Sequence, residues 1–201
     1  DRYKIDMAKL EYDKNDKEQV SDAFSRATAD VISLASMIMA ETSNVKSRSP
    51  LGVSAVALQR LDTNYGGHKT LREVVYTDKR KGIWNNSSDY LSKFLVFEDA
   101  FIKIFAMDNH QHQYNKLSNL DLSNATDAQK KKVETKKEEY KSKKNAMLEK
   151  LSKMVYTTLK DGKELKINNT VVEKMRKVLY KSYWCLDNKE SLKSKFRNAT
   201  G

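Results

Sequence analysis

The sequence predicts an all-α protein, and three observations support this prediction. The chain of 201 residues contains only six glycines and one proline, so few residues interrupt helices. Apolar residues recur at three- and four-residue spacing over long stretches. Several of these stretches begin with a helix-capping pattern. We expect three parts: a charged N-terminal arm (1–20), a helical domain (21–125) and a lysine-rich helical extension (126–201).

The composition is strongly basic. Lysine and arginine number 38 against 27 aspartates and glutamates, which gives a formal net charge of +11. Such a charge favours an anionic partner, such as nucleic acid, anionic lipid or an acidic cell-wall polymer; a merely well-solvated surface is the alternative. The single cysteine, Cys185, rules out an internal disulfide. No apolar run approaches the roughly 20 residues that span a bilayer, so no transmembrane segment is expected.

The N-terminal segment, residues 1–20, is charged throughout. It lacks the apolar centre of a signal peptide, and it does not begin with methionine. We therefore expect a processed product or a piece of a longer chain.

The first predicted helix begins at Ser21, a suitable N-cap that is followed by Asp22 in the first turn. Its residues 31–40 are almost all apolar, and the run ends abruptly at Glu41. A helix that is apolar on all sides is buried. We expect this helix at the centre of the core.

A second predicted helix begins at Ser49, with Pro50 at the first position, and continues to Leu61. Proline is tolerated there because the first N–H of a helix has no partner within the helix. This helix is rich in small residues, which let two backbones approach closely, so we expect tight packing on the first helix. The small residues are Gly52, Ser54, Ala55 and Ala57.

A two-glycine turn, residues 62–69, precedes Thr70, which can cap a short helix over 71–76. A polar loop follows, and Ser88 or Asp89 then begins a longer helix. An apolar stripe runs along this helix, and residues 109–124 read as a polar connector. The stripe consists of Tyr90, Phe94, Phe97, Phe101, Ile104 and Phe105.

The remainder, residues 126–201, is predicted to be a helical hairpin packed on the first part or on a partner. Thr126 to Gln129 forms a capping box before a lysine-rich helix that ends near Asp161 and Gly162. Thr170 to Glu173 is a second capping box, at the start of the last helix.

Glu41 is the residue that most suggests chemistry. A carboxyl group at the end of a buried helix loses solvation, which raises its pKa. A carboxylic acid that stays protonated near neutral pH can donate a proton to a leaving group, and glycosidases require such an acid beside the scissile bond. The alternative is a side chain in the last helical turn that points to water and has no role.

Aromatic and amide residues follow Glu41 at positions predicted to lie near loops. Aromatic rings stack on the apolar faces of sugar rings, and amides bind sugar hydroxyl or N-acetyl groups. Each residue taken alone is equally consistent with ordinary packing or a surface turn. The candidate substrate-binding residues are Gln59, Tyr65, Tyr76, Trp84 and Asn85.

Three segments, MAETSN, SPLGVSAVALQRL and KTLREVVYTDKRKGIWN, resemble the spore-cortex-lytic family of cell-wall hydrolases in order and spacing. The resemblance covers residues 31–86. It implies a lysozyme-like helical fold and cleavage of peptidoglycan between N-acetylmuramic acid and N-acetylglucosamine, often by lytic transglycosylation. Glu41 would act first as acid and then as base, and Thr42 would orient its carboxyl group. No cofactor and no metal are implied.

The chain also departs from that family. Gln59 stands where the family has asparagine, the sequence before Trp84 differs, and residues 126–201 have no counterpart. A divergent active enzyme and an inactivated descendant both remain open. If water is the nucleophile, a second carboxylate would help. Asp62, Glu73 and Asp78 are nearest in sequence, and the alternative for each is an ordinary surface residue.

These observations lead to three functional hypotheses. The first is a peptidoglycan-cleaving enzyme located in a virion or outside the cytoplasm, with residues 126–201 contacting other virion or secretion-machine proteins. The second is an inactive structural protein on the same scaffold. The third, a nucleic-acid-binding protein, is disfavoured because glutamates alternate with lysines in the lysine-rich helix. His110 and His112 lack the spacing of a zinc site, and Cys185 reads as a buried small hydrophobe.

Overall fold

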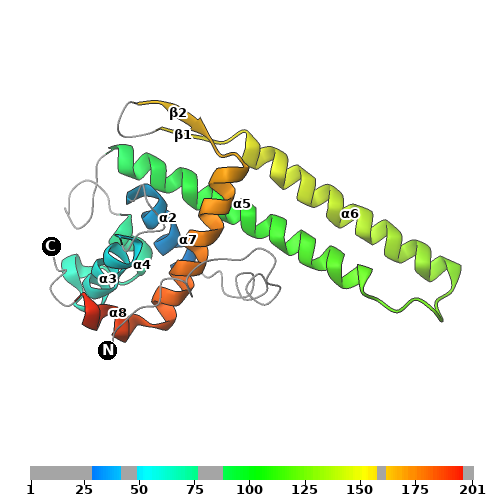
Figure 1. The fold of residues 1–201 in the computed structure, drawn as a ribbon, viewed down its shortest axis with the longest axis horizontal. Coiled ribbons are helices and arrows are strands. Elements are labelled where there is room, and N and C mark those ends of the chain that lie inside the picture. Colours follow the sequence, from blue (N-terminus) through cyan, green and yellow to red (C-terminus); the bar gives the residue numbers. More distant parts are fainter. Residues whose placement is uncertain (1–28, 42–48, 77–87, 158–161, 197–201) are drawn as a thin grey trace.

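The computed structural model describes residues 29–41, 49–76, 88–157 and 162–196. These residues form an all-α protein with one small β-hairpin, so the predicted fold class is confirmed. Figure 1 shows a cluster of helices from which the distal parts of two long helices project side by side. The elements are α2 (Ala29–Glu41), α3 (Ser49–Asp62), η2 (Tyr65–Gly67), α4 (Leu71–Val75), α5 (Ser88–Ser118), α6 (Asp127–Ser152), β1 (Val155–Thr157), β2 (Glu164–Lys166), α7 (Asn169–Asp187) and α8 (Lys189–Lys195).

Helix α2 lies at the centre of the core, as its all-round apolar sequence predicted. Every residue from Ser33 to Ala40 is buried. Helices α3, α4, α5 and α7 all pack against it. The predicted N-cap, Ser21, lies outside the described residues. Nine of the 13 residues of this helix are buried, and the burial of their apolar side chains stabilises the fold.

Helix α3 begins at Ser49, as predicted, but it does not pack mainly on α2. It contacts α2 and packs more extensively against α4, α7 and α8. Gly52 lies close to Phe196, since a side-chain carbon at position 52 would be in ordinary van der Waals contact with that ring, at 3.7 Å. The close approach predicted from the small residues therefore involves the C-terminal helices as well.

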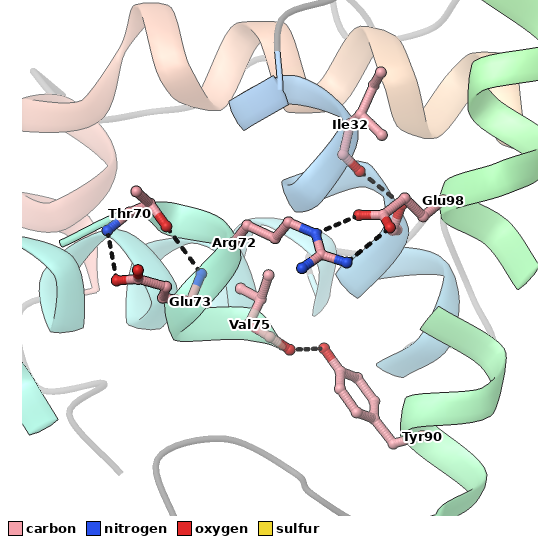
Figure 2. Close-up of polar contacts among 8 residues, drawn as sticks. Ile32, Thr70, Arg72, Glu73, Val75, Tyr90 and Glu98 are labelled. Atoms are coloured by element: carbon pink, nitrogen blue, oxygen red, sulfur yellow. Dashed lines mark hydrogen bonds and ion pairs between the residues drawn. The ribbon is translucent and has the colours of Figure 1, made fainter. Parts of the chain in front are cut away.

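The turn before α4 has the backbone that its glycines predicted. Asn64, Gly66 and Gly67 have positive φ angles of 52°, 74° and 76°, a region that glycine adopts without strain. The expected capping box follows. The Thr70 hydroxyl accepts from the Glu73 N–H, and the Glu73 carboxylate accepts from the Thr70 N–H (Figure 2). The Glu73 carboxylate also accepts from the Lys69 N–H.

Helix α5 is longer than predicted. The expected stripe is buried from Tyr90 to Ile104, but residues 109–118, predicted to be a polar connector, continue the helix. The prediction was wrong because α6 packs along this part of α5 and provides contacts that the polar sequence does not reveal. The Lys144 ammonium donates to the Gln111 side chain at 2.6 Å, and this is one such contact.

Helix α6 begins at the predicted capping box of Thr126 and Gln129 but ends at Ser152, before the predicted end. A two-stranded antiparallel sheet follows, with Tyr156 opposite Leu165. The segment Val155–Thr157 consists of residues that favour strands. The Tyr156 ring packs on Phe97 at a centroid distance of 5.0 Å, which joins the hairpin to α5.

The C-terminal helices are arranged differently from the prediction. The hairpin partner of α6 is α5, whereas α7 returns to the core and packs against α2 and α3. The predicted boundary at residue 126 thus falls between the two arms of a hairpin. Helix α7 is capped by Asn168, whose side chain accepts from the Val171 N–H, rather than by Thr170. An ion pair between Asp108 and Arg176 further joins α5 to α7.

The Tyr90 hydroxyl should contribute measurably to stability. It donates to the Val75 carbonyl at 2.8 Å in a buried site. Tyr90→Phe removes the donor and leaves a buried acceptor unsatisfied, so the free energy of unfolding in urea should fall by about 1–3 kcal/mol. Tyr156→Phe is the control, because within the described residues the Tyr156 hydroxyl makes no hydrogen bond. Equal losses in the two variants would contradict this assignment.

Candidate functional site

Glu41 lies at the end of the apolar helix, as the sequence predicted. It is the last residue of α2, and it is half-buried. The two residues before it, Met39 and Ala40, are 4% and 1% exposed. Its carboxyl group therefore lies where the buried helix meets the surface.

The first turns of α5 lie beside Glu41. Burial raises the pKa of the Tyr90 phenol, and the negative charge of Glu41 raises it further. Burial lowers the pKa of the Lys93 ammonium, while the charge of Glu41 acts in the opposite direction. Glu41 is therefore within electrostatic range of both a phenol and an ammonium group.

A second lysine reaches this region from α7. The charge of Lys174 lowers the pKa of Lys93, so the two ammonium groups face each other closely enough to repel. Burial also lowers the pKa of Lys174. Asp89, one turn before Lys93, partly offsets the effect on Lys93. The site thus combines carboxylates with two partly desolvated lysines, a combination that is common at functional sites.

Lys93 also lines a pocket of about 180 Å³ between α5 and the β-hairpin. Asp89 and Ser92 of α5 line one side of it, and the strand residues 155–157 line the other. Lys93 therefore connects the surroundings of Glu41 with a hollow that can hold a small polar ligand. Sequence reasoning missed Lys93 and Lys174, because nothing distinguishes them from the other lysines until α5 and α7 pack together.

Tyr76 is brought to the same end of α5. It is half-buried, and its ring lies 5.2 Å from Phe94 and 5.0 Å from the Arg72 guanidinium. Phe94 in turn contacts Tyr90, at a ring distance of 6.2 Å. Because neighbouring side chains occupy the Tyr76 ring, it is suited to forming part of the wall of a site rather than to stacking on a sugar.

An ion pair holds α4 against α5 (Figure 2). The Arg72 guanidinium donates two hydrogen bonds to the Glu98 carboxylate, at 2.8 Å and 2.9 Å. This pairing raises the pKa of Arg72. The two-point geometry fixes the direction of α4 and so positions Tyr76 and the Val75 carbonyl.

Gln59 and Tyr65 lie elsewhere. Gln59 is in the last turn of α3, and its backbone carbonyl accepts from the N–H and hydroxyl of Thr63. Tyr65 is 52% exposed, with the Arg60 guanidinium 5.3 Å from its ring centre. Among the described residues, neither makes a hydrogen bond, ion pair or ring contact with Glu41.

The other predicted residues fall into two groups. Thr42, Asp78, Trp84 and Asn85 lie outside the described residues. Two candidates for a second carboxylate have structural partners instead. Asp62 pairs with Lys193, and Glu73 serves the capping box, whose N–H groups lower its pKa.

The remaining motifs show no metal or thiol chemistry. In the ranges that the structure describes, no group of three or more His, Cys, Asp or Glu side chains is placed to hold a metal ion. Cys185 is buried, as predicted, and burial raises its pKa to about 12, so the thiolate is strongly disfavoured. No described helix is long and apolar enough to cross a bilayer.

The fold and the site together define an all-α protein in which a buried helix presents a carboxylate near two lysines. Comparison of the chain with protein-family models, curated proteins and solved structures finds no significant match in any of the three. Without such a match, the geometry around Glu41 is what indicates a function.

The lysine pair should reduce stability at neutral pH. The folded-state pKa of Lys93 lies below its ordinary value of 10.5, so keeping it protonated costs folding free energy. Lys93→Met should therefore raise the free energy of unfolding at about pH 7. That gain should shrink as the pH rises through the folded-state pKa towards about 10.5.

Urea unfolding at about pH 7 and about pH 10 measures this difference. Lys150→Met is the control, because Lys150 is exposed on α6 and has no ion-pair partner among the described residues. A Lys93→Met variant that is less stable than the parent at neutral pH, or whose gain grows with pH, would show that the assignment is wrong.

Proposed function

We propose that this chain cleaves the glycan strands of peptidoglycan, with Glu41 as the general acid and base. One observation carries the proposal: the half-buried Glu41 ends a helix in which every residue from Ser33 to Ala40 is buried. The core fixes the position of this group at the end of the helix, where Glu41 is partly exposed. The sequence around it resembles that of cell-wall hydrolases.

The proposed reaction needs a single carboxyl group. Protonated Glu41 donates its proton to the glycosidic oxygen as the bond from C1 of N-acetylmuramic acid breaks. The resulting carboxylate then accepts the proton of the 6-hydroxyl of the same sugar, and this oxygen bonds to C1. The products are a 1,6-anhydromuramoyl end and a new N-acetylglucosamine end, and Glu41 is again protonated. If water attacks instead, the muramoyl end is reducing.

The neighbouring lysines suit this substrate. Peptidoglycan carries carboxylates on its stem peptides, and positive charge is available from Lys93, which lies near both Glu41 and Lys174. An anion bound there would relieve the repulsion between the two ammonium groups. The +11 net charge would also favour adsorption to an anionic wall, and this adsorption should weaken in salt.

Glu41→Gln tests the catalytic assignment, because it preserves size and removes the proton donor. Soluble muropeptides released from purified peptidoglycan are measured by mass spectrometry. We expect the rate of release to fall by about 10²- to 10⁴-fold relative to the parent chain. Glu138→Gln, a change at an exposed glutamate of α6, is the control and should leave the rate unchanged.

The chemical nature of the new ends identifies the reaction. Anhydromuramoyl ends would indicate transglycosylation, and reducing muramoyl ends would indicate hydrolysis. Release by Glu41→Gln at the parental rate would exclude Glu41 as the acid.

A second candidate function is supported by the same surroundings. A carboxylate beside a phenol and an ammonium group also suits a purely structural role, in an inactive protein that keeps the scaffold. The projecting α5–α6 hairpin would then contact other components of a virion or secretion machine. Failure of folded parent and variant alike to release muropeptides from several wall types would favour this candidate.

A further inference from the structure

A second pocket lies between the arms of the α5–α6 hairpin, with a volume of about 240 Å³. Helix α5 contributes one wall and α6 the other (Figure 1). None of the proposed catalytic residues takes part. The lining residues are His110, Gln111, Tyr114, Tyr140, Lys141, Lys144 and Asn145.

The charge of this pocket is uncompensated. Elsewhere on α6, Lys136 and Lys143 pair with Glu139, and Lys137 pairs with Glu134. The lining of the pocket, in contrast, contains two lysines and no carboxylate. The Lys144 ammonium donates to the neutral side chain of Gln111. Lys141 makes no hydrogen bond or ion pair with any described residue.

Other polar groups in the pocket also lack partners. The Nδ1 atom of His110 is buried without a hydrogen bond. The hydroxyls of Tyr114 and Tyr140 make none with the described residues. Buried polar groups are normally satisfied by protein, water or ligand. The pocket thus offers ammonium, phenol and amide groups to a ligand that carries negative charge and several hydroxyls.

The volume of the pocket and the surroundings of its aromatic rings limit which ligands can bind there. The volume lies below the roughly 300–1,000 Å³ of pockets for drug-sized molecules, so a single ring fits better than an extended chain. Ammonium groups lie against both aromatic rings: Lys137 is 5.4 Å from the Tyr114 ring centre, and Lys143 is 5.7 Å from that of Tyr140. Stacking of a nucleic-acid base, which needs an open ring face, is therefore disfavoured.

We propose that this pocket binds one acidic sugar unit, a ring whose carboxylate or phosphate contacts Lys141 and Lys144. It is a non-catalytic site that holds the chain on its polymer. The assignment of the cell wall as the source of the sugar rests on the proposed function. The carboxylate would come from a muramic acid residue that carries no stem peptide, and the phosphate from a phosphorylated sugar of the wall.

Binding is measured by calorimetry on the full chain carrying Glu41→Gln, so that turnover does not consume the ligand. The probes are N-acetylglucosaminyl-N-acetylmuramic acid, N-acetylglucosamine 1-phosphate, neutral N,N′-diacetylchitobiose and a single-stranded oligodeoxynucleotide. Either acidic wall probe should bind more tightly than chitobiose and the oligonucleotide. Lys141→Gln should weaken that binding about tenfold.

Lys131→Gln is the matched control, because it removes the same charge from an exposed position of α6 outside the pocket lining. It should leave binding unchanged, and thermal melts should show that both variants fold. Equal weakening by the two substitutions, tighter binding of chitobiose or the oligonucleotide, or no binding of either acidic probe would overturn the proposal. Acidic-sugar binding without any muropeptide release by the parent would instead overturn only the proposed enzymatic function.

Discussion

The burial of α2 on all sides is the constraint on which the rest of the structure depends. A helix with apolar residues around its whole circumference cannot lie on a surface, so other helices must cover each face. Four do so, and they come from distant parts of the sequence. The apolar run is preceded by the exposed Asp30 and ends at the half-buried Glu41. Its half-buried position is therefore a consequence of core formation, whether or not it has acquired a catalytic role.

Helix α5 links the core around α2 to the rest of the molecule. Its first half presents aromatic side chains to α2, and its second half leaves the core and supports α6. The Tyr90 hydroxyl and the Glu98 carboxylate attach α4 to the same helix. One continuous helix thus connects the surroundings of Glu41 with the hairpin pocket, and a ligand at either end binds a part of the same rigid element.

Local signals predicted much of the secondary structure. The capping residues Thr70 and Thr126, the two-glycine turn and the aromatic stripe of α5 all depend on neighbours within a few residues. The C-terminal half of α5 and the pairing of α6 were missed because they depend on tertiary contacts. On α6, half-buried lysines, Lys137 and Lys144, share the inner face with Val133, Tyr140 and Met147, so the apolar stripe looked too sparse to identify its partner.

The residues of the candidate site were likewise predictable only where they depend on local sequence. Glu41 was predictable because an apolar run ends at it, and the structure brings Tyr76 to the same end of α5 through its contact with Phe94. Lys93 and Lys174 were not predictable, since their proximity arises only when α5 and α7 both pack on α2.

Two like charges in a partly desolvated site reduce folding stability, and an anion between them would reverse that cost. Such an arrangement is unfavourable in the isolated protein but favourable in a complex with an acidic ligand. The hairpin pocket follows the same pattern, since Lys141 and Lys144 face a hollow without a carboxylate. Two mutually repelling lysines near Glu41, and two more lysines that line a pocket without a carboxylate, are easier to reconcile with a protein that binds an acidic polymer along its length than with one stabilised by its own ion pairs.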